Sequence, residues 1–124
     1  MPVPILKQSG VLIATIQAAL TDHDLVQLKD DLAEKVGRFR AHGVVIDVTA
    51  LDVMDSFATR TLRMIAETTR LRGAVTVIVG IQPDVAMAMV QLGLLLDGIS
   101  TALDLEEGLE LLAVRLRAGG ARGG

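Results

Sequence analysis

The stretch that decides the fold runs from Val44 to Ala58 and reads VVIDVTALDVMDSFA. It begins as an apolar strand, passes through a turn bearing three carboxylates, and reaches Ser56 at the start of an amphipathic helix. The strand is apolar on both faces except for Asp47, which predicts a central place in a sheet. Backbone N–H groups of the helix start lie beside the Ser56 hydroxyl, which a rigid element presents to solvent. This suits a group that another protein modifies or reads, and does not by itself supply a catalyst.

Apolar runs of strand length alternate with helical patterns on both sides of this stretch, which predicts α/β layering. Before it, Ser9-Gly10 supplies a hairpin turn, and Thr21 with Asp24 forms an approximate capping box ahead of a helix. After it, Pro83 fits the first turn of a third helix. The expected elements are a hairpin over 5–16, helices over 25–39 and from 56, 83 and 105 onward, and strands over 44–48, 74–79 and 99–103.

The chain has 124 residues, a length that fits one domain. Hydrophobic residues make up 51% of it and the mean hydropathy is +0.50, so we expect some apolar surface to be reserved for other subunits. We predict one α/β domain over 1–117, a mixed, mostly parallel sheet of about five strands flanked by about four helices. The glycine-rich segment 118–124 has nothing to bury and is predicted to be a disordered tail.

Several classes of function are disfavoured by composition. The uncharged, apolar stretch 85–96 has twelve residues, well short of the ~20 that cross a bilayer, and the N-terminus lacks the pattern of a signal peptide. There is no cysteine for disulfides or thiolate metal sites. The net charge is −3 and neither Tyr nor Trp is present, which disfavours nucleic acid as a partner. We therefore expect a cytoplasmic protein that binds neither membrane nor nucleic acid.

The acidic turn has two interpretations. Asp47, Asp52 and Asp55 lie near the C-terminal edge of a strand, where α/β sheets place their sites, so they could hold Mg²⁺ in a small phosphohydrolase. Aspartates also accept backbone N–H bonds in turns and at helix starts. No basic residue lies in the turn and no phosphate-binding glycine loop is present, which favours turn chemistry. His23 and His42 are not at metal-ligand spacing. We expect no catalytic residue, metal or cofactor.

Ser56 also has two interpretations. Serine is a preferred helix N-cap, and capping is its commonest role at such a boundary. However, the residue three positions on is Thr59, so no Glu or Gln completes a capping box. Asp55 could cap the helix equally well and leave Ser56 pointing outward. The spacing alone leaves both roles open.

The outward face of the same helix carries Arg60, Arg63, Glu67 and Arg70. It is either a solvated face with an Arg63–Glu67 pair at i,i+4 or a docking surface for an acidic partner. A functional Ser56 would favour docking, because this helix would then be the element presented to the partner.

The run from Val44 to Ala58 resembles the signature of STAS domains, the anti-sigma factor antagonist family: an apolar strand, Asp, a hydroxyl residue, then Asp-Ser opening a helix. The resemblance covers roughly 4–116 and includes GIQP at 80–83, the Leu92-Gly93 break and TALDLEEGL at 101–109. These later stretches are similar to single-domain RsbS-type stressosome scaffold proteins. The order of three matching segments makes the resemblance specific.

This resemblance implies a non-enzymatic scaffold that assembles with a larger STAS paralogue into a cage holding a switch serine/threonine kinase. The kinase would phosphorylate Ser56 and be released to activate its target. Antagonists of the family tend to have a small hydroxyl residue and glycine after the phosphorylated serine, whereas this chain has Phe57-Ala58, which favours the stressosome branch. The alternative is a direct antagonist that binds an anti-sigma factor kinase.

The expected partner contacts are Asp55, Phe57, Thr59, Arg60 and Arg63, around Ser56. Phe57 would be a hydrophobic anchor if exposed, and otherwise a core residue. Homodimers and larger assemblies are expected from the surplus of apolar residues.

Overall fold

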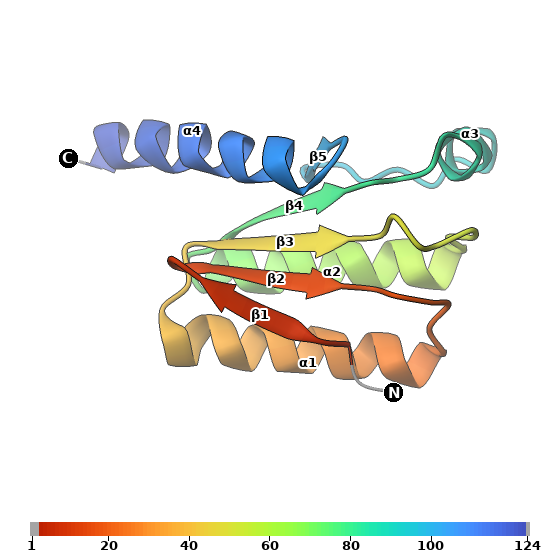
Figure 1. The fold of residues 1–124 in the computed structure, drawn as a ribbon, viewed down its shortest axis with the longest axis horizontal. Helices are drawn as coiled ribbons and strands as arrows, with labels where there is room; N and C mark the ends of the chain where they lie inside the picture. Colours follow the sequence, from red (N-terminus) through yellow and green to blue (C-terminus); the bar gives the residue numbers. More distant parts are fainter. Residues whose placement is uncertain (1–2, 124) are drawn as a thin grey trace.

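Within residues 3–123, which this computed structural model describes, five strands lie side by side in sequence order to form one sheet (Figure 1). β1 pairs antiparallel with β2 and the other neighbours pair parallel, so the expected α/β fold with a mixed, mostly parallel sheet is confirmed. The elements are β1 (Ile5–Gln8), β2 (Val11–Thr15), α1 (Asp22–Phe39), β3 (Gly43–Asp47), α2 (Ser56–Leu71), β4 (Val75–Val79), α3 (Pro83–Gln91), β5 (Ser100–Ala102) and α4 (Leu105–Gly123).

A two-residue turn joins β1 to β2. Ser9 and Gly10 both have positive φ angles, 51° and 79°, as a type I′ hairpin turn requires. Pairing then runs from Gln8 opposite Val11 to Ile5 opposite Ala14. The predicted hairpin is confirmed, and β3 lies at the centre of the sheet as expected.

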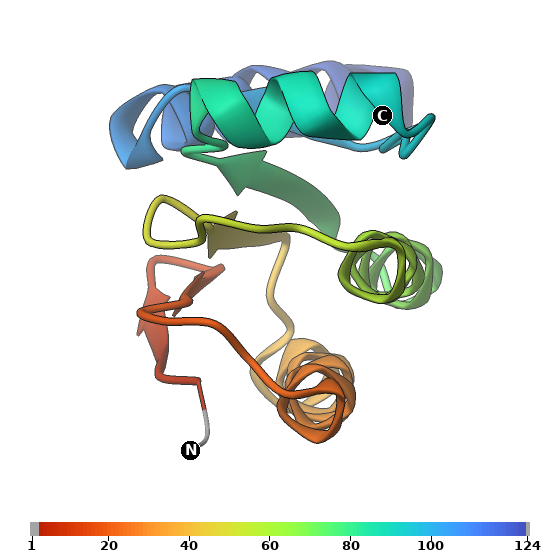
Figure 2. The same cartoon turned by 90° about the vertical axis from the view of Figure 1, so that its right-hand side faces the viewer.

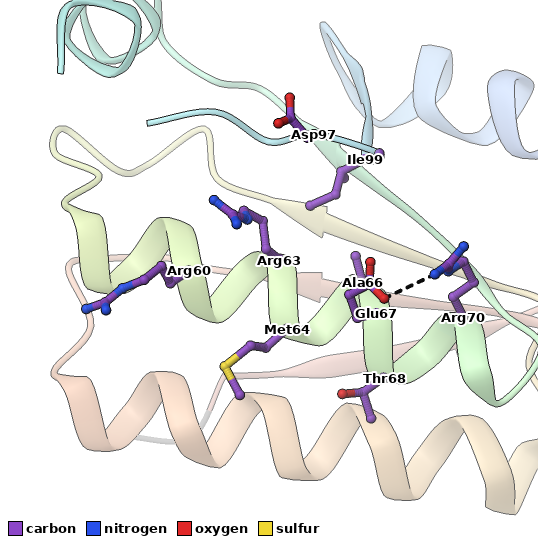
Figure 3. Close-up of a pocket in the computed structure, with 10 residues that line it drawn as sticks. Arg60, Arg63, Met64, Ala66, Glu67, Thr68, Arg70, Asp97 and Ile99 are labelled. Atoms are coloured by element: carbon purple, nitrogen blue, oxygen red, sulfur yellow. Dashed lines mark hydrogen bonds and ion pairs between the residues drawn. The ribbon is translucent and has the colours of Figure 1, made fainter. Parts of the chain in front are cut away.

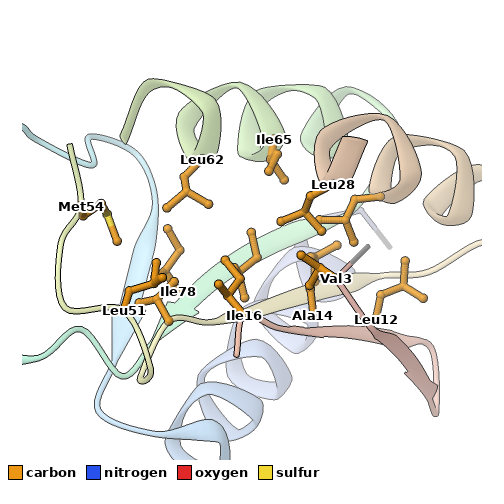
Figure 4. Packing of buried hydrophobic residues seen from close by; sticks show 14 of the residues in the cluster. Val3, Leu12, Ala14, Ile16, Leu28, Leu51, Met54, Leu62, Ile65 and Ile78 are labelled. Atoms are coloured by element: carbon orange, nitrogen blue, oxygen red, sulfur yellow. The ribbon is translucent and has the colours of Figure 1, made fainter. Parts of the chain in front are cut away.

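Helices α1 and α2 cover one face of the sheet and α4 packs on the other (Figure 2). Strand side chains alternate between the two faces, as the pleat requires. The cluster beneath α1 and α2 is the larger one, and Figure 4 shows strand residues such as Leu12 and Ile78 meeting Leu28, Leu62 and Ile65 of the two helices. The smaller cluster consists of Ile13, Val45, Val77, Val79 and Leu112.

The start of α1 confirms the predicted capping box. The Thr21 hydroxyl accepts a hydrogen bond from the Asp24 N–H at 3.1 Å, and the Thr21 N–H donates to Oδ2 of Asp24 at 3.1 Å. The backbone hydrogen bond from Thr21 lowers the pKa of the Asp24 carboxyl, because it favours the ionised form. Pro83 lies in the first turn of α3, also as predicted.

The C-terminal helix continues past the predicted domain limit at residue 117. α4 extends to Gly123, through the segment predicted to be a disordered tail. Side chains of residues 118–124 lie outside the described part of the chain, so the domain limits of 1–117 and the tail stay predictions. None of the helices described is long and apolar enough to span a bilayer.

Candidate partner-binding site

Ser56 lies where the turn after β3 meets α2, at the edge of the sheet where the parallel strands end (Figure 1). Two apolar side chains hold this turn against the core: Leu51 is 7% exposed and Met54 is 5% exposed. Figure 4 shows both pointing toward the buried cluster. Asp52 and Val53, between them in sequence, are exposed. Leu51 and Met54 therefore anchor the turn to the core, and Asp52 and Val53 face solvent.

Asp55 caps α2. Its Oδ1 accepts a hydrogen bond from the Ala58 N–H at 2.8 Å, and its backbone is extended, with φ −81° and ψ −178°. Ser56 is exposed, and within the described residues its hydroxyl makes no hydrogen bond. The choice between the two candidate caps, left open by the sequence, falls on Asp55. The Ser56 hydroxyl is consequently available to a modifying enzyme or a partner.

The other two carboxylates of the turn have structural partners. Oδ1 of Asp47 accepts hydrogen bonds from the N–H of Thr49 at 2.9 Å and from its hydroxyl at 2.6 Å. Oδ1 of Asp52 lies 3.4 Å from Nε2 of Gln82. Across the described chain, no group of three His, Cys, Asp or Glu side chains could hold a metal ion. The geometry matches the turn interpretation of these aspartates.

Gln82 is a site residue that the sequence did not reveal. Its Nε2 donates to the carbonyl of Thr49 at 2.7 Å, which ties the turn before Ser56 to the start of α3. Gly80, with φ +82°, lets the Thr49 side chain lie against the Gly80 backbone, because a Cβ at position 80 would overlap the Thr49 hydroxyl. The only available signal was that Gln82 belongs to the GIQP stretch that supports the family resemblance. Its contact lies 33 positions away, beyond any local pattern.

Two predicted contacts differ in their accessibility. Phe57 is half-buried, so the residue is partly accessible to solvent. Thr59 is 1% exposed and its hydroxyl donates to the backbone carbonyl of Asp55 at 2.9 Å. This corrects the expectation for Thr59: its side chain stabilises the first turn of α2 and cannot contact a partner in this conformation.

The outward face of α2 carries arginines whose pairing differs from the prediction. Glu67 pairs with Arg70, at 3.1 Å, and the expected Arg63–Glu67 pair is wrong. An acid N-terminal to the base is the more favourable order on a helix, which Glu67–Arg70 has and Arg63–Glu67 lacks. Nη1 of Arg63 instead lies 3.5 Å from the carbonyl of Leu95, and Nε of Arg60 lies 3.4 Å from the carbonyl of Ser56. Both arginines are exposed.

Comparisons with known proteins match the family and the fold of this chain. A family model described as the STAS domain matches residues 3–108. A serine-to-glutamate variant of RsbS from Moorella thermoacetica is 37% identical, with a TM-score of 0.80 over 93% of this chain and 97% of that chain. A chain of a solved structure described as "Molecular architecture of the stressosome, a signal integration and transduction hub" is 39% identical to this chain. The TM-score is 0.75, and the match covers 92% of this chain and 99% of that chain.

Among curated proteins, the RsbT co-antagonist protein RsbRA of Bacillus subtilis (strain 168) is 30% identical over 84 residues, which cover 68% of this chain and 31% of RsbRA. The RsbT co-antagonist protein RsbRD of the same organism is 22% identical over 100 residues, or 81% of this chain and 36% of RsbRD. The chain thus spans about a third of the length of these two relatives. On the match to the family model, the chain belongs to the STAS domain family.

Proposed function

We propose that this chain is a non-enzymatic scaffold of the stressosome type, which binds a switch serine/threonine kinase and releases it when Ser56 is phosphorylated. The observation that carries the proposal is the Ser56 hydroxyl, which is exposed on the first turn of α2 while Asp55 caps the helix. Similarity to RsbS and to a stressosome chain supports a regulatory role of this kind.

In the proposed reaction the kinase transfers the γ-phosphoryl group of ATP to Oγ of Ser56. The Oγ–P bond forms, the hydroxyl proton passes to a base of the kinase, and ADP leaves. The product carries about −1.5 to −2 charge and three acceptor oxygens at pH 7. The N-terminus of α2 favours this charge by about 0.3–1 kcal/mol. Asp52 and Asp55 oppose it, each by on the order of 1 kcal/mol at a protein surface.

The opposing terms exceed the favourable one by about 1–2 kcal/mol. This is small beside the stability of a typical domain, about 5–15 kcal/mol, so the local fold survives phosphorylation while the surface becomes more negative. A partner that fits a neutral hydroxyl then loses its complement. In this proposal the kinase contacts Asp55, Phe57, Arg60 and Arg63 around Ser56. Thr59 is left out because it is buried.

Assembly is the second part of the proposal. We propose a cytoplasmic protein that forms homodimers and larger assemblies with a longer STAS paralogue. The similarity to RsbRA and RsbRD supports a paralogue of this kind. Large apolar side chains are exposed on and after α3, with Met87 at 62%, Val90 at 72% and Leu92 at 70%, and such a patch indicates an interaction surface.

The direct test is to incubate the purified chain with ATP and each switch-type kinase of its source, and to localise the phosphate by mass spectrometry. We expect one phosphate on Ser56, none on the Ser56→Ala variant, and unchanged incorporation in Ser9→Asn, which removes an exposed serine but keeps the hairpin turn. Ser56→Ala should also retain the kinase permanently, and Ser56→Asp should weaken its capture. Full incorporation into Ser56→Ala would show that the modified residue lies elsewhere.

Co-purification separates the scaffold from a direct anti-sigma factor antagonist. A large particle that contains a longer STAS protein supports the scaffold. A small binary complex with an anti-sigma factor kinase contradicts it.

A further inference from the structure

Two grooves flank the outward face of α2 and share Arg60 and Met64. The larger, of about 710 Å³, lies between α2 and the segment before β5, and Figure 3 shows Arg63 and Ile99 on its opposite walls. The smaller, of about 300 Å³, lies between α1 and α2 and includes Lys29. The face between them starts one turn after Ser56.

Cations outnumber carboxylates in these grooves. The lining contains four basic residues, Lys29, Arg60, Arg63 and Arg70, against two acidic ones, Glu67 and Asp97. Arg70 is paired with Glu67 at 3.1 Å, and Lys29 lies 3.9 Å from Asp30. Within the described residues, Arg60 and Arg63 form no ion pair, and their contacts with backbone carbonyls are long, at 3.4 and 3.5 Å. Two guanidinium groups therefore remain available to bind carboxylates, which their planar fork fits well.

Apolar side chains lie between these charges. Met64 is 51% exposed on the face that both grooves share. Ile99 is half-buried in the larger groove, and Phe57 is half-buried in the smaller one. An occupant that matches the surface must bring apolar side chains and carboxylates together.

Resting on the proposed function, we infer that the outward face of α2 docks an acidic, partly apolar segment of the same partner that reads Ser56. The surface is continuous with the Ser56 site, because Arg60 lies one helical turn from Ser56 and contacts its backbone carbonyl. The surplus of cations in the grooves requires an acidic segment. Met64, Phe57 and Ile99 require that the segment also carry apolar side chains.

This arrangement links phosphorylation to release. Residues at i and i+4 are neighbours on a helix surface, so a phosphate on Ser56 lies within reach of the Arg60 guanidinium. Such a pair is charge-assisted and strong. The phosphate would occupy the arginine that the acidic segment needs and would repel the segment's carboxylates. The segment is then released without refolding of α2.

Binding of a synthetic peptide tests this inference without a kinase. The probe is a ten-residue peptide of Glu and Leu, compared with the same peptide carrying Gln in place of Glu, titrated into the full ¹⁵N-labelled chain. We expect shifts in the side-chain Nε–H signals of Arg60 and Arg63, and at least tenfold tighter binding of the Glu peptide. Ser56→Asp and the double variant Arg60→Gln/Arg63→Gln should each weaken it at least fivefold. Arg115→Gln/Arg117→Gln, which alters two exposed arginines on α4, should bind as the unmodified chain does.

The other outcomes overturn either this inference or the proposed function on which it rests. Equal binding of both peptides, or no shift at millimolar peptide, overturns it. Shifts of the same arginine signals on raising the chain concentration without peptide would identify a second copy as the occupant and overturn the assignment to a partner. A kinase that Arg60→Gln/Arg63→Gln captures with unchanged affinity overturns the inference but leaves the Ser56 scaffold intact. If the Glu peptide binds as expected but no switch-type kinase phosphorylates Ser56, the proposed function alone is overturned.

Discussion

Asp55 and Ser56 are adjacent, both are exposed, and both are good helix caps by residue type, but only Asp55 caps α2. Replacing each by alanine therefore separates the two roles. Asp55→Ala removes the acceptor for the Ala58 N–H. Ser56→Ala removes a hydroxyl that, within the described residues, makes no hydrogen bond.

The expected magnitudes follow from the geometry. Loss of an N-cap costs about 1 kcal/mol, and loss of a negative charge at a helix N-terminus adds about 0.3–1 kcal/mol. For 124 residues, each kcal/mol lowers Tm by about 4 °C. Asp55→Ala should thus reduce the free energy of unfolding by about 1–2 kcal/mol and Tm by about 4–8 °C. Ser56→Ala should stay within about 0.5 kcal/mol of the unmodified chain.

Urea denaturation at pH 7, followed by circular dichroism, measures both changes. Asp55→Asn is the matched control, because asparagine caps as well as aspartate but lacks the charge. It should recover most of the stability that Asp55→Ala loses. Equal destabilisation by Ser56→Ala and Asp55→Ala would refute the assignment of Asp55 as the cap and, with it, the free Ser56 hydroxyl.

Three further changes test the fold around the site. Gly80→Ala should reduce the free energy of unfolding by at least about 2 kcal/mol, because φ at position 80 is positive and the new Cβ would meet Thr49. The same substitution should cost less in a Thr49→Ala background, and an equal cost in both backgrounds would show that the contact with Thr49 is unimportant. Thr69→Val should cost about 1–3 kcal/mol, because the buried Thr76 hydroxyl loses its 2.8 Å partner, and adding Thr76→Val should restore part of that loss in a double-mutant cycle. The backbone hydrogen bond from Thr21 lowers the pKa of Asp24 in the folded chain. The contribution of Asp24 to the free energy of unfolding is therefore complete above its ordinary pKa of 3.8, and it is lost as the pH falls through the lowered, folded-state pKa. Unfolding free energies measured from pH 5 to pH 2 should fall less steeply for Asp24→Asn, and an unchanged slope would contradict this.

Local signals in the sequence predicted most of the fold. The Ser9-Gly10 turn, the capping box of Thr21 and Asp24, and Pro83 each act within a few residues, so they could be interpreted without knowing the tertiary structure. The Val44–Val48 run was assigned to the centre of the sheet because it is apolar on both faces, and β3 lies there. These signals fix the elements because each satisfies the backbone locally.

The site was harder to predict because its geometry depends on competition and on distant contacts. Sequence pattern could not choose between Asp55 and Ser56 as caps, since either side chain can accept the same bond. Spacing suggested an Arg63–Glu67 pair, but Glu67 bonds to Arg70. Gln82 was missed because only the folded sheet brings it to the Thr49 carbonyl.

The most direct test of the central proposal is the affinity of the switch kinase for two forms of the chain, unmodified and fully phosphorylated on Ser56, measured by isothermal titration calorimetry. We expect phosphorylation to weaken binding at least tenfold, a loss of about 1.4 kcal/mol or more, with the circular dichroism spectrum unchanged. Equal affinity of the two forms would contradict Ser56 as the switch.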